Sequence, residues 1–531
     1  MASWLDKAVL YEIYPQSFYD TNSDGIGDLQ GIIERLDYVA SLGCNGIWLN
    51  PCFVSPFNDA GYDVSDYCSI APRYGTNDDM KRLIEAAKAR GIKIILDLVP
   101  GHTSIEHPWF KESMKGEKNE YTNRYIWTDT DEDAEDKTLP QSISSALHKA
   151  EGAERSGKYM CNFFPSQPAL NFGFGKVEKP WQLPWNHPDC IKTREAIKDV
   201  MRYWLNMGVA GFRVDMAFSL VKNDTDDRTY TKEVWKDIRK MLDEEYPDTV
   251  LISEWFNPTQ AIEAGFDADF YLQACPGYMS LMLMGDSSFF HPDGDGTCEP
   301  FAMEYSEHFE NAKALGGMTS TPTGNHDIVR MSYGRTPEQI KMILTFVFSL
   351  PGLPIVYYGD ELGMKYLDLE SKEGGMYRTG SRTPMQWSTG ENAGFSDAES
   401  SQLYLPIDPD ENRPNVEEQE NDPDSILNYT KRLIAMRKIN PALGNKADFK
   451  ILYTEDEKYP LVFARFCAQQ QLAVCFNPAD RECEVCLPLT FGDSPLIAHG
   501  DIKTEPCEGG TKLTMPPQSY WIVPYFKNKQ E

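Results

Sequence analysis

Gly211-Phe212-Arg213-Val214-Asp215 is a short apolar run that carries an arginine and ends on a carboxylate. We interpret it as a buried strand that runs out into a loop, because a helical pattern precedes it. Strand alternation places the side chains of Arg213 and Asp215 on the same side. A carboxylate held beside an arginine has a lowered pKa, as a catalytic nucleophile needs. A structural salt bridge at a strand end explains the pair equally well, so other stretches have to decide.

Apolar, β-rich runs alternate with amphipathic helical segments along most of the chain. The predicted strands are 9–14, 47–49, 92–99, 211–214, 249–253, 269–271, 318–321 and 353–358. The predicted helices include 31–42, 78–90, 192–207, 231–245 and 426–439. Strands that alternate with helices form parallel βαβ units, and this number of units fits a closed (β/α)8 TIM barrel.

Two parts of the chain depart from this alternation. Residues 101–167 are polar, include the acidic run 129–136, and are too long for a connector, so they predict a subdomain inserted after the third strand. After residue 440 the pattern changes to short alternating strands, which predicts a C-terminal antiparallel β-sandwich. The predicted domains are a catalytic barrel at 1–100 and 168–440, an inserted subdomain at 101–167 and a β-sandwich at 441–531.

Charge and composition exclude several classes of partner. The formal charge of −30, from 81 acidic and 51 basic residues, repels nucleic-acid phosphates and anionic lipids. No apolar run is long enough to span a membrane. The amino terminus lacks the pattern of a secretion signal, and the 12 cysteines are scattered, so we read most of them as reduced. We therefore expect a cytoplasmic monomer or small homo-oligomer that binds a neutral small molecule.

Carboxylates and histidines follow the ends of several predicted strands. They are Asp97 with His102, Asp215, Glu254, and His326 with Asp327. The carboxyl ends of the strands of a TM barrel meet at one rim, which is where such barrels carry their catalytic residues. We therefore expect these side chains to share one site, and a chance arrangement becomes hard to defend.

Three carboxylates at one rim predict the hydrolysis of a glycosidic bond with retention. That reaction takes two carboxyl groups roughly 5–5.5 Å apart, one ionised as the nucleophile and one protonated as the acid/base. Asp215 beside Arg213 is the expected nucleophile. Glu254 has apolar and aromatic sequence neighbours, which should raise its pKa and make it the acid. Asp327 would stabilise the positively charged transition state.

Six segments of the chain resemble motifs of one known family. Residues 97–102, 211–215, 253–255 and 325–327 resemble the four signature regions of the α-amylase superfamily, glycoside hydrolase family 13. With 167–171 and 381–387, the resemblance points to the oligo-1,6-glucosidase/α-glucosidase branch and covers nearly the whole chain.

The resemblance implies a role for each matching residue. Asp215 would be the nucleophile, Glu254 the acid/base and Asp327 the transition-state stabiliser. Tyr62 would stack on the sugar, and Asp59 would pair with Arg382 to close the pocket behind a non-reducing-end glucose, which implies exo action on short substrates. The predicted substrate-binding residues are Asp59, Tyr62, His102, Phe163, Gln167, Arg213, His326 and Arg382, of which His102, Arg213 and His326 would bind hydroxyl groups.

Three positions depart from the family pattern. Gly101 stands where the superfamily usually has an asparagine that commonly ligates calcium in true amylases, so we expect that calcium site to be absent. Met216 follows the nucleophile where many α-1,6-specific relatives have valine, which leaves the linkage preference open. Ala169 replaces the usual aspartate of the motif at 167–171, so the aglycone side is not defined.

A loop near the amino terminus offers a metal site. Asp20, Asn22, Asp24 and Asp28 place oxygen ligands at positions one, three, five and nine, with the carbonyl of Ile26 at seven, as in a calcium loop. The bidentate glutamate at position twelve is missing. The related α-glucosidases carry calcium here, so we expect structural Ca²⁺; Mg²⁺ and a metal-free Asx turn are the alternatives.

The leading hypothesis is a retaining exo-acting α-glucosidase that hydrolyses short substrates such as isomaltose, maltose or sucrose. A transglycosylase of the same fold, such as a trehalose synthase or sucrose isomerase, would use the same three acids. A catalytically silent, amylase-like transporter subunit is the remote alternative, because such subunits carry a membrane anchor and have usually lost catalytic acids.

Overall fold

The computed structural model describes residues 3–128, 147–372 and 378–527. The acidic run 129–136 lies outside these described residues.

Eight parallel strands close into a barrel in the order β1-β12-β11-β10-β9-β8-β5-β2. Their bounds are β1 (Leu10–Ile13), β2 (Gly46–Leu49), β5 (Lys93–Leu98), β8 (Gly211–Val214), β9 (Val250–Ser253), β10 (Ala268–Phe270), β11 (Met318–Pro322) and β12 (Leu353–Tyr357). Each predicted strand therefore exists, and the predicted TIM barrel is confirmed. The strands read as apolar runs because almost every residue in them is buried.

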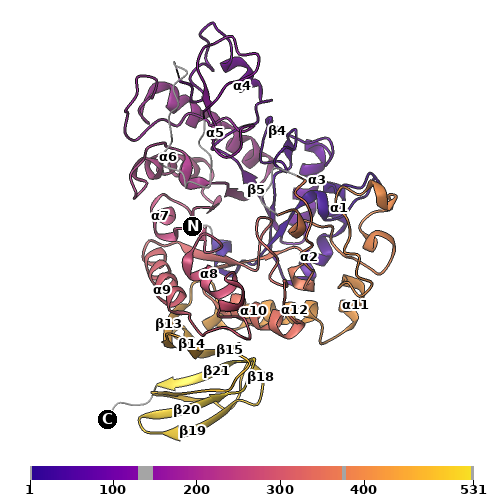
Figure 1. Ribbon diagram of the computed structural model, residues 1–531, viewed down its shortest axis with the longest axis vertical. Coiled ribbons are helices and arrows are strands. Elements are labelled where there is room, and N and C mark those ends of the chain that lie inside the picture. Colours follow the sequence, from indigo (N-terminus) through magenta and orange to yellow (C-terminus); the bar gives the residue numbers. More distant parts are fainter. Residues whose placement is uncertain (1–2, 129–146, 373–377, 528–531) are drawn as a thin grey trace.

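Helices surround the barrel (Figure 1). They include α1 (Leu29–Glu34), α2 (Leu36–Leu42), α3 (Asn77–Ala89), α5 (Pro188–Met207), α6 (Thr229–Glu245), α7 (Pro258–Glu263), α8 (Pro276–Met282), α9 (Glu299–Ala314), α10 (Pro337–Ser349), α11 (Val416–Asn421) and α12 (Ile426–Ile439). Capping boxes at Thr76 and Thr336 fix the starts of α3 and α10. The predicted helix 31–42 is divided at Arg35, whose φ and ψ of −102° and 7° are not helical.

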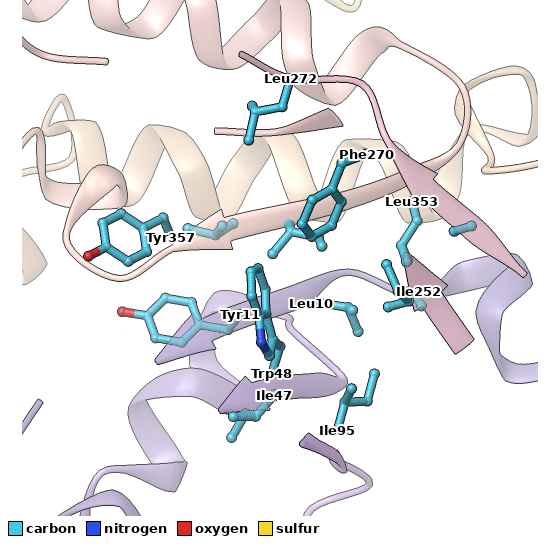
Figure 2. Close-up of a cluster of buried hydrophobic side chains, with 14 of the residues drawn as sticks. Leu10, Tyr11, Ile47, Trp48, Ile95, Ile252, Phe270, Leu272, Leu353 and Tyr357 are labelled. Carbon is cyan, nitrogen blue, oxygen red and sulfur yellow. The ribbon is translucent and has the colours of Figure 1, made fainter. Parts of the chain in front are cut away.

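Large side chains from opposite sides of the barrel fill its interior (Figure 2). The rings of Trp48 on β2 and Phe270 on β10 lie 5.5 Å apart, although these strands are on opposite sides of the closed sheet. Leu10 and Leu353 are fully buried in the same cluster. The interior is therefore packed, and any ligand has to bind at one end of the barrel.

The inserted subdomain lies between β5 and α5, at the upper end of the molecule in Figure 1. It contains α4 (Pro108–Ser113) and a two-stranded sheet of β6 (Leu147–His148) and β7 (Tyr159–Met160). Bridges join Cys161 to Pro168 and His102 to Ala169, so the pairing continues past residue 167, where we placed the end of the insertion. A second small sheet pairs β3 (Phe53–Val54) with β4 (Asp66–Ile70).

The C-terminal part is built from two antiparallel sheets, as predicted. One holds β13 (Asp448–Glu455), β14 (Lys458–Phe466), β15 (Gln471–Asn477), β17 (Leu489–Phe491), β18 (Ile497–His499) and β21 (Ser519–Lys527), and the other β16 (Cys483–Leu487), β19 (Lys503–Cys507) and β20 (Gly510–Met515). Residues of both sheets, such as Val462 and Leu513, form one buried cluster. The strands predicted after residue 440 are 461–466, 472–476, 482–487, 512–515 and 521–525, so β13, β17, β18 and β19 were not predicted. Most residues of β19 are exposed.

No helix among the described residues is long and apolar enough to cross a membrane. None of the twelve cysteines forms a disulfide.

Candidate active site

The loops after β5, β8, β9 and β11 meet at the carboxyl end of the barrel around a cavity of about 70 Å³. The cavity is lined by Asp59, Tyr62, His102, Phe163, Asp215, Met216, Glu254, Asp327 and Arg378. The three predicted catalytic acids are therefore brought together in one pocket. At roughly 10–15 Å³ per water, the pocket has room for about five to seven waters, which suits a single small ring rather than a polymer.

Arg213 lies behind this cavity and contacts three carboxylates. Its Nη1 lies 2.8 Å from Asp97 Oδ1 and 3.4 Å from Asp215 Oδ1, and its Nη2 lies 2.9 Å from Glu254 Oε2. The guanidinium lies over the ring of Trp48, with 5.1 Å between Cζ and the ring centroid. One guanidinium therefore contacts both Asp215 and Glu254.

The pKa of Asp215 is raised well above its ordinary value, by burial and then by the charge of Glu254. We expected Arg213 to lower it. That prediction is wrong, because Arg213 lies closer to Asp97 and Glu254 than to Asp215, and its charge is divided among them.

Met216, the residue after Asp215, has a left-handed backbone with φ of 40° and ψ of 44°. Such a conformation costs a non-glycine residue on the order of 1–3 kcal/mol. It points the Met216 N–H at Glu254 Oε2, at 3.0 Å. Arg213 contacts the same oxygen, so the contacts that the described residues make with this carboxyl group are directed to Oε2.

Asp327 is held by two arginines. Its Oδ1 lies 3.0 Å from Arg378 Nη1 and 2.9 Å from Arg382 Nη2, and its Oδ2 lies 3.3 Å from His326 Nε2. Burial acts to raise the pKa of Asp327, but His326 and the two guanidinium groups outweigh it and hold the pKa well below the ordinary value. Asp327 is thus ionised at every physiological pH.

Asp59 pairs with Arg378, not with Arg382 as we predicted. One Asp59 oxygen binds Arg378 Nη2, and the other accepts from Gln167 Nε2 at 2.7 Å. Arg382 is already committed, because its Nε donates to the carbonyl oxygen of His326 at 2.8 Å and its Nη2 to Asp327. Arg378 stands four residues before Arg382 in the sequence, and that second arginine was the available signal.

Tyr62 joins the pocket wall to buried groups behind it. Its hydroxyl lies 2.9 Å from Asp97 Oδ2 and 2.7 Å from His326 Nε2, and its ring stacks on His326 with 5.3 Å between centroids. His326 Nδ1 lies 2.8 Å from Glu12 Oε1. Glu12 was not predicted, although a carboxylate within an apolar strand is the kind of residue that rarely lies buried without a role.

Four predicted substrate residues lie behind the cavity rather than in its wall. They are Gln167, Arg213, His326 and Arg382, all at most 1% exposed. Arg213 Nη1 contacts Asp97, and His326 contacts Glu12 and Tyr62. Direct contact of Arg213 and His326 with sugar hydroxyls stays a prediction. Both residues hold the carboxylates and the wall in position. Asp63 accepts from the backbone N–H of Asn58 and of Asp59 and shapes this loop.

The larger cavities lie elsewhere. One of about 480 Å³ is lined by Trp4, Lys88, Lys93, Asp248 and their neighbours, at the amino ends of β5, β8 and β9. Barrels of this type carry out chemistry at the opposite end, where the acids lie.

The predicted metal loop is held by Asx turns. Asp20 accepts from the backbone N–H of Asn22, Ser23 and Gly25, and Asp28 caps α1 through the N–H of Gly31. No three His, Cys, Asp or Glu side chains in the described part of the chain are grouped to hold a metal ion. The donor set still suits a hard cation, because it consists of oxygens and the side chains of Asn22 and Asp24 are exposed. The metal stays a prediction.

Comparisons with known proteins agree with this geometry. The sequence model of the family described as "Alpha amylase, catalytic domain" matches residues 12–446. The chain is 32% identical to the trehalose synthase/amylase of Mycobacterium tuberculosis over 83% of this chain and 76% of that one. It is 30% identical to the oligo-1,6-glucosidase of Parageobacillus thermoglucosidasius over 90% and 91%. The crystal structure of isomaltulose synthase from Erwinia rhapontici NX5 superposes with a TM-score of 0.79 at 25% identity, covering 99% of both chains.

Proposed function

The chain belongs to the α-amylase family, glycoside hydrolase family 13, and on that premise we propose that it is a retaining, exo-acting α-glucosidase of short α-glucosides. The observation that carries the proposal is the single Arg213 guanidinium that binds Asp215 and Glu254 beside a pocket the size of one sugar ring. Retaining glycosidases use two such carboxyl groups, one as the nucleophile and one as the acid/base.

In the first step, ionised Asp215 attacks C1 of the terminal glucose. Glu254 transfers its proton to the glycosidic oxygen, the C1–O bond breaks, and a β-glucosyl ester forms on Asp215. This step requires a proton on Glu254, and Met216 N–H and Arg213 contact its Oε2 rather than its Oε1. Asp327, ionised and held by Arg378 and Arg382, stabilises the positive charge that develops on the sugar.

In the second step, Glu254 is ionised and acts as a base. It takes a proton from water, the hydroxide attacks C1, and the ester to Asp215 breaks to release glucose with its original α configuration. A sugar hydroxyl in place of water would give a transglycosylation product. The same residues therefore serve hydrolysis and isomerisation.

The acid limb of the pH profile reports on Asp215. Burial and Glu254 raise the pKa of Asp215 above its ordinary value of 3.8. The nucleophile must be ionised, so kcat/KM rises as the pH increases through the raised pKa, and the acid limb is expected above pH 3.8. Measuring kcat/KM on maltose from about pH 3 to about pH 9 locates both limbs. An acid limb at or below 3.8 would contradict the burial argument.

Arg378→Ala is expected to open the closed end of the pocket. It removes the partner of Asp59 and one of the two arginines on Asp327, and breaking a buried pair costs roughly 2–5 kcal/mol. We expect kcat/KM on maltose to fall about a hundredfold, and a maltooligosaccharide capped at its non-reducing end to become a substrate.

Arg413→Ala is the matched control for this variant. Like Arg378, Arg413 lies between β12 and α11, but it donates to the carbonyl oxygens of Asp408 and Asp410 and does not line the cavity. Its kcat/KM should match that of the unaltered protein. An Arg378→Ala enzyme that keeps full activity and still rejects the capped substrate would refute the closing role.

The transglycosylase alternative has equal support from the relatives, since their names include a trehalose synthase/amylase and an isomaltulose synthase. The two proposals differ in what attacks the intermediate. Incubation with sucrose, isomaltose, maltose and trehalose, followed by product chromatography, decides between them. Free glucose from one of these sugars supports the hydrolase, and an isomeric disaccharide without free glucose overturns it.

We propose further that Asp20, Asn22, Asp24, the Ile26 carbonyl and Asp28 bind a structural Ca²⁺. Ca²⁺ that binds only the folded chain adds about 2.7 kcal/mol at a hundred times its Kd, so Tm should rise when it is added after EDTA treatment. Asp24→Ala should abolish the rise, and Mg²⁺ tests the competing ion. An EDTA-treated protein whose Tm is indifferent to both ions would exclude the site.

A cytoplasmic location and a monomer or small homo-oligomer remain predictions from the sequence. Cell fractionation and analytical ultracentrifugation test them.

A further inference from the structure

Gly101 leaves a space that a side chain from the inserted subdomain fills. A Cβ atom at position 101 would lie only 2.7 Å from Asn162 Nδ2, which is closer than such atoms approach without a shift. The backbone of Gly101 is not among those with positive φ, so its conformation alone would accept another residue. A side chain at position 101 would therefore force the Asn162 carboxamide to shift.

The Asn162 carboxamide is completely buried and contacts two loops of the barrel rim. Its Oδ1 accepts from Lys222 Nζ at 2.6 Å, and its Nδ2 lies 3.2 Å from His102 Nδ1 and 3.4 Å from Ser219 Oγ. Lys222 also donates to the carbonyl oxygen of Ser219 at 2.7 Å. His102 follows β5, whereas Ser219 and Lys222 follow β8, which carries the nucleophile.

The donor and the acceptor in each of these hydrogen bonds can be assigned. His102 Nε2 lies 3.0 Å from the carbonyl oxygen of Tyr62, which can only accept, so Nε2 carries a proton. Burial lowers the pKa of His102 to about 3, so the ring is neutral and Nδ1 is an acceptor. Lys222 can only donate, which turns Oδ1 of Asn162 toward it and Nδ2 toward His102.

We propose that Asn162, oriented by Lys222, is a positioning residue that holds His102 in the Nε2–H tautomer at the wall of the catalytic pocket. His102 lines the pocket, and Asn162 is also 4.0 Å from the sulfur of Met216, the residue beside the nucleophile. The effect on catalysis rests on the proposed function, but the tautomer and the packing can be measured without substrate.

The tautomer is measured by ¹⁵N NMR of the full chain labelled at histidine, with His102→Gln used for assignment. We expect a bare Nδ1 and a protonated Nε2 in the unaltered protein. Asn162→Asp keeps an acceptor for Lys222 but cannot donate to Nδ1, so His102 should take up a proton there. A protonated Nδ1 in the unaltered protein, or identical spectra in the two proteins, would overturn the proposal.

The kinetic consequence is measured on whichever disaccharide the unaltered protein converts. Asn162→Asp should lower kcat/KM about tenfold and change its pH profile, since a positioning hydrogen bond is lost and a charge is gained. Asn171→Ala is the matched control: Asn171 is a buried asparagine of the same segment whose Oδ1 accepts from Gly173 N–H. It should lower Tm without changing the pH profile. Equal pH profiles for Asn162→Asp and the unaltered protein would refute the catalytic part.

The packing is measured by a double-mutant cycle on Tm with Gly101→Ala and Asn162→Ala. The added Cβ collides with Asn162 only when the carboxamide is present, so Gly101→Ala should lower Tm strongly alone and little beside Asn162→Ala. Equal losses in both backgrounds would overturn the packing argument. If the protein converts no sugar, the proposed function is wrong. The NMR spectra and the double-mutant cycle still test the role of Asn162, because neither needs a substrate.

Discussion

Asp215→Ala is expected to remove turnover almost completely, lowering kcat by about 10⁴-fold or more. Without the carboxylate no glucosyl ester can form, and the remaining acids cannot replace it. The fold should survive, because Asp215 lies at the end of β8 and its buried carboxyl group is costly beside Glu254. We expect an unchanged or higher Tm, measured by thermal unfolding.

Azide provides the decisive control for this variant. With the nucleophile gone, the anion can enter the vacated space and attack C1 of α-glucosyl fluoride from the β face. The expected product is β-glucosyl azide, identified by NMR of the anomeric proton. Asp215→Asn, which keeps the shape but not the charge, should be equally inactive. Residual activity above a hundredth of the unaltered value in either variant would refute Asp215 as the nucleophile.

Glu254→Gln is expected to lower kcat on disaccharides by about a thousandfold, within the range of general acid catalysis. The amide can still accept from Met216 N–H but has no proton to give to the glycosidic oxygen. Substrates whose leaving group needs no proton should be affected much less in the first step. We expect a burst of dinitrophenolate from 2,4-dinitrophenyl α-glucoside, followed by slow hydrolysis of the ester on Asp215.

Azide again separates the roles, since it needs no base. It should accelerate the second step of Glu254→Gln and yield α-glucosyl azide, the anomer opposite to that formed by Asp215→Ala. If Glu254→Gln lowers kcat equally on the dinitrophenyl glucoside and on disaccharides, Glu254 is not the acid. The pair of anomers therefore tests both assignments with one reagent.

The barrel could be predicted from the sequence because parallel strands that are buried on both faces consist of continuous apolar residues. The three acids could be predicted for the same reason: Asp215 and Glu254 each follow such a run directly, and Asp327 follows another after a short loop. The sequence did not predict β19, since an exposed polar strand has the same composition as a loop.

Partner choice and protonation depend on distances in space. Arg378 and Arg382 are only four residues apart, so the sequence does not distinguish which of them pairs with Asp59. The folded chain shows that Arg378 binds Asp59, while Arg382 donates to the carbonyl oxygen of His326. In the sequence Arg213 lies two positions from Asp215, whereas Glu254 is distant. Only the fold shows that Glu254 contacts the same guanidinium and, together with burial, raises the pKa of Asp215.

The sequence by itself determined that this protein is a TIM barrel with three acids at one rim, because local patterning dictates strands and their ends. The tertiary structure alone decided how Arg213 divides its charge, which arginine closes the pocket, and why Gly101 stands before His102. Those answers are set by burial and by side chains such as Asn162 that come from distant parts of the chain, and electrostatic and steric energies depend on distance in space rather than along the sequence.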